Sequence, residues 1–66
     1  MSSPKFNVEV QLTGTDGNAF AIMGKVQKAL REAGATKDQI SEYSKESMSG
    51  DYNNLLATAM RWVWVG

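Results

Sequence analysis

The chain has 66 residues, with seven Lys and Arg balancing seven Asp and Glu, and it contains neither cysteine nor histidine. This length supports one domain, near the lower size limit for folding without covalent staples. The missing residue types exclude disulfides, most zinc sites and histidine general-base catalysis, and we therefore expect no enzyme activity, no metal and no cofactor. Balanced charge also argues against a nonspecific polyanion binder.

The N-terminal segment carries no targeting signal. Residues 1–4 (Met1-Ser2-Ser3-Pro4) lack a hydrophobic signal region, and we expect them to form a disordered tail ahead of a single domain at 5–66. No apolar run approaches the roughly 20 residues that span a bilayer. A cytoplasmic location without membrane association is the expectation.

The first predicted element is a strand at residues 5–13. Apolar and polar residues alternate there, which is typical of a strand with one buried and one solvated face. Its apolar positions are Phe6, Val8, Val10 and Leu12.

A polar turn at residues 14–18 leads into a predicted helix at 18–33. Gly34 suits the left-handed position that follows a helix, whereas Gly24 inside it costs about 1 kcal/mol relative to alanine. Glycine would be explained at this position if a neighbouring strand or helix packed closely against Gly24. The apolar stripe consists of Ala19, Ile22, Met23, Val26, Leu30 and Ala33.

The next predicted helix spans about 37–48. Thr36-Lys37-Asp38-Gln39 reads as a capping box at its start. Its apolar stripe is thin (Ile40, Tyr43 and Met48), and four serines lower its helix propensity. We expect it to be the least stable of the helices.

A third helix is predicted after Gly50, with Asp51 as its cap. Its apolar stripe comprises Tyr52, Leu55, Leu56, Ala59 and Met60. Residues 61–65 are β-branched and aromatic and favour a second strand. The fold class is therefore α+β, a small β-α-α-α-β domain whose two-stranded sheet is covered on one face by three helices. Three roughly antiparallel helices return the chain to its starting direction, so the strands should be parallel.

The two C-terminal tryptophans are the clearest surface signal. If residues 61–65 form a strand, alternate side chains face opposite sides of the sheet. Either Trp62 and Trp64 or Val63 and Val65 then face outward. An exposed pair of tryptophans would mark an interface. Alternatively, Trp62 ends the helix and packs in the core, which leaves Trp64 outside. In both cases Trp64 is the candidate contact residue.

Two charged stripes offer further candidates. Asp38, Glu42 and Glu46 form an acidic line that could contact a basic partner or simply face solvent. Lys25, Lys28 and Arg31 form a basic ridge. The ridge could touch phosphates, could pair with the acidic line within the chain or across a dimer, or could face solvent.

The turn at 14–18 lies between a strand and a helix, where backbone amides can bind phosphate. It lacks the lysine of a P-loop and the glycine spacing of a dinucleotide site, and Asp16 would repel an anion. A turn in which Asp16 or Asn18 caps the helix is the simpler interpretation.

Parts of the chain show a recognisable pattern of residues, GxDGNAFAI at 14–22, SGDYxxLL at 49–56 and MRWV at 60–63. This pattern covers most of residues 8–65 and resembles a family of short uncharacterised proteins encoded by bacteriophages and bacterial genomes. Such proteins commonly end Trp-Val-Asp-Val, and Trp64 stands here where the acidic residue would be. The resemblance implies an intracellular, phage- or prophage-associated setting and supplies no activity.

The leading hypothesis is a small noncatalytic protein-interaction module of phage or prophage type that binds a protein partner or forms a homodimer. Its candidate interface is Trp64, Trp62, Asp38, Glu42 and Glu46. The alternative is a nucleic-acid-binding accessory protein that uses Lys25, Lys28, Arg31 and Arg61. An enzyme or phosphate-binding domain built on the 14–18 turn is the least favoured class.

Overall fold

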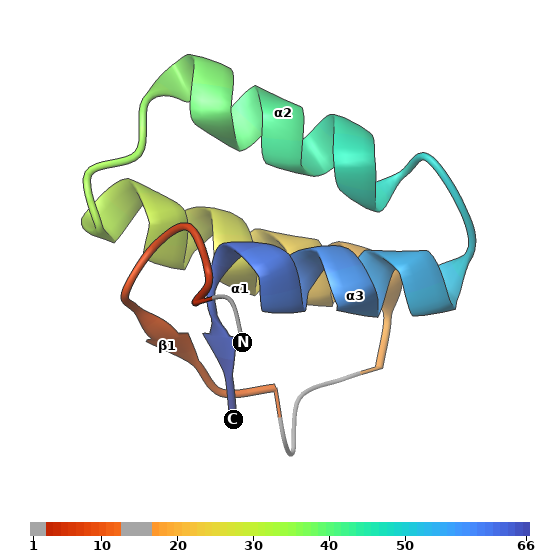
Figure 1. The fold of residues 1–66 in the computed structure, drawn as a ribbon. Helices are drawn as coiled ribbons and strands as arrows, with labels where there is room; N and C mark the ends of the chain where they lie inside the picture. Colours follow the sequence, from red (N-terminus) through yellow and green to blue (C-terminus); the bar gives the residue numbers. More distant parts are fainter. Residues whose placement is uncertain (1–2, 13–16) are drawn as a thin grey trace.

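A computed structural model describes residues 3–12 and 17–66 of the chain. Its elements follow the order β1 (Glu9–Val10), α1 (Ala19–Glu32), α2 (Lys37–Ser47), α3 (Tyr52–Trp62) and β2 (Trp64–Val65). Figure 1 shows β1 and β2 side by side below the helices. The predicted β-α-α-α-β fold is confirmed. Within the described residues, no helix has the length and apolar character needed to cross a membrane.

The two strands are parallel, as predicted. Glu9 pairs with Trp64, and Val10 pairs with Val65. Backbone hydrogen bonds extend this ladder: Val8 O accepts from Trp64 N at 2.9 Å, and Leu12 N donates to Gly66 O at 3.1 Å. The alternation of burial predicted for the first strand is present, with Val10 buried and Glu9 exposed.

Both strands are shorter than the sequence predicts. β2 begins only at Trp64 because α3 continues to Trp62, so the expected strand at 61–65 is partly helical. The start of the expected first strand therefore meets a helix end. Lys5 N donates to Arg61 O at 3.0 Å and Phe6 N donates to Trp62 O at 2.9 Å, which satisfies two carbonyls in the last turn of α3.

The helix caps form as their sequences indicate. The Asn18 side chain accepts from the Phe20 amide at the start of α1, and the Thr36–Gln39 capping box is complete at α2. Asp51 accepts from the Asn54 amide at the start of α3. Gly34 has a φ of 93°, the left-handed conformation expected after α1.

The three helices form two layers above the sheet. α1 packs on β1 and α3 packs on β2, while α2 packs on α1 and α3 (Figure 1). The main core cluster joins β1, the three helices and the residue that precedes β2, through Val10, Val26, Leu30, Tyr43, Ala59, Trp62 and Val63. A smaller cluster of Ile22, Met23 and Leu55 lies between α1 and α3.

Gly24 has no packing role within the described chain. A Cβ atom built on it meets no other atom within 4 Å, and the residue is exposed on α1. The expectation that a neighbouring strand or helix packs closely against it is therefore wrong. Within residues 3–12 and 17–66, no contact at this position offsets the low helix propensity of glycine.

Candidate functional site

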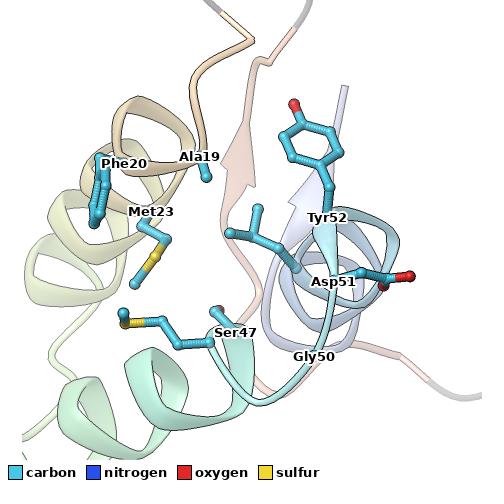
Figure 2. A pocket seen from close by; sticks show the side chains of 9 residues that line it. Ala19, Phe20, Met23, Ser47, Gly50, Asp51 and Tyr52 are labelled. Atoms are coloured by element: carbon cyan, nitrogen blue, oxygen red, sulfur yellow. The ribbon is translucent and has the colours of Figure 1, made fainter.

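An apolar groove of about 300 Å³ opens where three helix ends meet. The first turns of α1 and α3 and the last turn of α2 surround it. Figure 2 shows Phe20 and Met23 on one side, Ser47 below and Tyr52 opposite. The complete lining is Ala19, Phe20, Met23, Ser47, Met48, Gly50, Asp51, Tyr52 and Leu55.

The rim of this groove exposes large apolar side chains. Phe20 is 73% exposed, Met48 is 63% exposed and Tyr52 is 43% exposed. Met23 and Leu55, in contrast, are buried and belong to the smaller core cluster. A buried apolar base with an exposed apolar rim is the surface type that proteins use for binding rather than for solvation.

Local structure fixes the position of each rim residue. The Asn18 cap sets Phe20 in the first turn of α1, and Met48 stands directly after the last residue of α2. Tyr52 is the first residue of α3, and its hydroxyl donates to Gly17 O at 2.7 Å. This bond ties the start of α3 to the segment that enters α1, so the two helix ends that border the groove are held together.

The loop between α2 and α3 is fixed by Asn54. Its side-chain amide donates to Glu46 O at 2.8 Å and to Ser49 Oγ at 3.3 Å. Asn54 also packs against Gly50, where a Cβ atom would lie only 3.0 Å from Asn54 Cβ. Glycine at position 50 therefore permits the close approach that closes this end of the groove.

Ser47 of the groove lies near Tyr43 of the main core cluster, and both hydroxyls are buried. Ser47, which lines the groove, is 1% exposed and Tyr43 is fully buried, and neither side-chain oxygen completes a hydrogen bond within the described residues. Burial raises the pKa of the Tyr43 hydroxyl, and the nearby Ser47 hydroxyl opposes that shift. Both hydroxyl oxygens are therefore enclosed by the protein and are not open to the groove.

Comparison with known proteins found no relative of this chain. No family model, curated protein or solved structure matches the chain.

Trp62 does not lie on the candidate interface that the sequence suggested. Its side chain is 1% exposed and stacks on Phe6 with ring centroids 6.1 Å apart. The rings of Trp62 and Tyr43 form a T-shaped contact with centroids 5.8 Å apart. Lys5 Nζ lies 4.2 Å from the Trp62 ring centroid. Since Trp62 is the last residue of α3 rather than a strand residue, its side chain points into the core.

Trp64 is the C-terminal aromatic residue that remains at the surface. It is 47% exposed, and its Nε1 donates to Asn7 Oδ1 at 3.0 Å. This hydrogen bond ties the ring to the segment that precedes β1. Trp64 thus provides a second exposed apolar site, which does not line the groove.

The acidic line is only partly available to a partner. Glu46 Oε2 accepts from Trp62 Nε1 at 2.7 Å, and Glu42 lies 4.0 Å from Lys5 Nζ. Asp38 is exposed in the first turn of α2, where its charge complements the helix dipole. Glu46 therefore contributes to the packing of α2 against α3, whereas the side chain of Glu42 stays largely exposed.

The side chains of the basic ridge are exposed but lie in two different environments. Lys25 Nζ donates to Gln11 O at 2.9 Å. Lys25 and Lys28 also line a shallow depression with Glu9 and Glu32, whose carboxylates would repel phosphate. Acidic residues within the same depression argue against a nucleic-acid surface here.

The other two nucleic-acid candidates lie outside that depression. Arg31 is exposed near the end of α1. Arg61 donates to Thr58 Oγ1 on its own helix at 2.9 Å.

The phosphate-binding hypothesis for the 14–18 turn depends largely on residues 14–16, which lie outside the described residues. Asn18 acts as the helix cap, and the Gly17 carbonyl accepts the Tyr52 hydroxyl. Among the described residues, no group of three or more acidic, histidine or cysteine residues could hold a metal ion.

The groove residues Phe20, Met48 and Tyr52 were not candidates in the sequence. Met48 and Tyr52 belong to apolar helical stripes and were expected to face the core. Phe20 offered a signal, because it lies next to the predicted α1 stripe rather than within it. A large apolar residue off the buried stripe is expected to be exposed.

Proposed function

We propose that this protein is a small noncatalytic interaction module that binds another protein through the apolar groove. The observation that carries the proposal is the gathering of Phe20, Met48 and Tyr52, all exposed, around one groove. Exposing three large apolar side chains in one place is unfavourable for an isolated small domain. A partner that covers them would recover this cost.

A phage or prophage setting and a cytoplasmic location are also part of the proposal, and the resemblance to short phage and bacterial proteins supports them. A homodimer is a further part of the proposal. Trp64 provides the alternative surface for self-association, because it is exposed in β2 and does not line the groove.

A pair of methionine variants tests the groove. Met48→Glu places a charge on its rim, whereas Met60→Glu places one on a methionine of α3 that is 58% exposed and does not line the groove. Tagged wild-type protein and both variants are used to capture proteins from cells in which the protein is expressed. Proteins retained by wild type and Met60→Glu but lost with Met48→Glu support the proposal. Retention by all three contradicts it.

The mass in solution over a range of concentrations tests self-association. Wild type, Met48→Glu and Trp64→Asp are compared. A wild-type dimer that only Met48→Glu converts to a folded monomer places the self-interface on the groove. A dimer lost only in Trp64→Asp places it on the sheet face, and a wild-type monomer at all concentrations contradicts the homodimer.

A further inference from the structure

One stripe of α1 continues from the groove along the solvent side of the helix. It consists of Phe20, Gly24, Lys28 and Arg31, which follow one another at intervals of four, four and three residues and so lie on one face. All four are exposed. The α1 outer stripe therefore begins at the apolar groove and ends in two cations.

Gly24 lies in the middle of this stripe. Nothing in the described chain approaches its Cβ position within 4 Å, so glycine is not required there for packing. A glycine on the surface of a helix does, however, permit the backbone of a second helix to come close. The position is suited to contact with another helix rather than to the folding of this one.

The two cations at the end of the stripe lie apart from the acidic line of the chain. Glu42 pairs with Lys5 and Glu46 accepts from Trp62, so the acidic line does not turn toward α1. Lys28 borders the depression beside β1 that Glu9 and Glu32 also line, but among the described residues neither Lys28 nor Arg31 lies within ion-pair distance of a carboxylate. The charge that complements Lys28 and Arg31 would come from a partner.

The size of the groove limits what it could hold alone. A volume of about 300 Å³ accommodates only a few side chains. α1 has 14 residues and is therefore about 21 Å long. A partner that lies along the whole outer stripe makes contact over several helical turns and buries more surface than one confined to the groove.

We propose that the groove and the outer stripe of α1 together bind one amphipathic helix of a partner protein. The partner's apolar side chains enter the groove beside Phe20 and Met48, its backbone passes close to Gly24, and its acidic side chains lie over Lys28 and Arg31. This inference rests on the proposed function and names the chemistry of the partner. Helix-in-groove recognition of this kind uses apolar anchors spaced along one helix face.

Two synthetic peptides test the preference for acidic partners. Both have about 18 residues and the same helical stripe of leucines, and the positions beside the leucines are glutamate in one and lysine in the other. Fluorescence anisotropy should show the glutamate peptide binding about threefold to tenfold more tightly at low salt, with a smaller ratio at high salt. Equal binding or preference for the lysine peptide would overturn the inference.

Charge-reversed variants locate the effect. The double variant Lys28→Glu with Arg31→Glu should lose the preference for the glutamate peptide. Lys37→Glu, which changes an exposed cation at the start of α2, should retain it. If both variants behave alike, the preference does not arise from the outer stripe and the inference fails.

Two substitutions at Gly24 test the close approach. Gly24→Ala adds one methyl group and should leave peptide binding within about twofold, whereas Gly24→Leu should weaken it about tenfold or more. Circular dichroism confirms that both variants fold. Unchanged binding by Gly24→Leu would overturn the inference, and if Met48→Glu still abolishes capture from cells, the proposed function stands without it.

Discussion

The indole Nε1 of Trp62 donates a hydrogen bond of 2.7 Å to Glu46 Oε2, and this bond joins the end of α3 to α2. Trp62 is buried, whereas Glu46 is partly exposed. A carboxylate at the protein surface thus satisfies a donor in the core. The same packing holds α2 in place, and the end of α2 contributes Ser47 to the groove, followed directly by Met48.

Glu46→Ala should destabilise the protein by about 1–3 kcal/mol, because it leaves the buried indole N–H of Trp62 without its charged acceptor. Glu42→Ala is the matched control. Its ion pair with Lys5 is exposed at 4.0 Å, and its loss should cost no more than about 1 kcal/mol. Urea unfolding followed by tryptophan fluorescence measures both. Equal midpoints for the two variants would contradict this role of Glu46.

Alanine substitutions at two glycines should have opposite effects. Gly24→Ala should stabilise the protein by about 0.5–1 kcal/mol, because the Cβ meets nothing and helix propensity improves. Gly34→Ala should destabilise it by about 1 kcal/mol, because φ is 93° there. Thermal unfolding compares the two variants. A lower melting temperature for Gly24→Ala would show a constraint on the helix that the structure does not contain.

Stability should fall at alkaline pH through Tyr43. Burial raises its pKa in the folded state, so the unfolded chain releases the hydroxyl proton first. Full stability is therefore present below the unfolded pKa of about 10 and declines as the pH rises above it. Urea midpoints from pH 8 to about 11 should fall more steeply for wild type than for Tyr43→Phe. Parallel pH profiles for the two proteins would exclude Tyr43 as the cause.

Trp64→Asp should leave the domain folded. Trp64 is 47% exposed, and its side chain is held by one surface hydrogen bond to Asn7. We expect helical circular dichroism close to that of wild type and a loss of stability of about 1 kcal/mol or less. Trp62→Asp, at a buried position, should prevent folding. A folded Trp62→Asp protein would show that the core does not depend on this residue.

The local features of the fold could be predicted from the sequence because nearby residues determine them. The capping box at Thr36 and the left-handed Gly34 depend on neighbours within a few positions. The alternating burial of Phe6 to Leu12 follows from the period of the strand. Parallel pairing followed from the number of helices between the strands.

The groove and the environment of Trp62 could not be predicted in this way. Trp62 contacts Phe6 and Tyr43, which are far from it in sequence, and only the closed fold brings them together. The groove depends on where the end of α2 lies relative to the starts of α1 and α3. No local pattern specifies that arrangement, so Met48 and Tyr52 read as ordinary core residues.

The NMR signals of the methionine methyl groups can show whether a partner binds in the groove. The chain has four methionines, of which Met23 and Met48 line the groove and Met60 does not. NMR spectra of protein labelled with ¹³C at the methionine methyls are recorded alone and with the partner captured from cells. Binding in the groove predicts that the Met23 and Met48 signals shift or broaden while Met60 stays unchanged. A shift of Met60 with Met48 unchanged would contradict the groove as the binding surface.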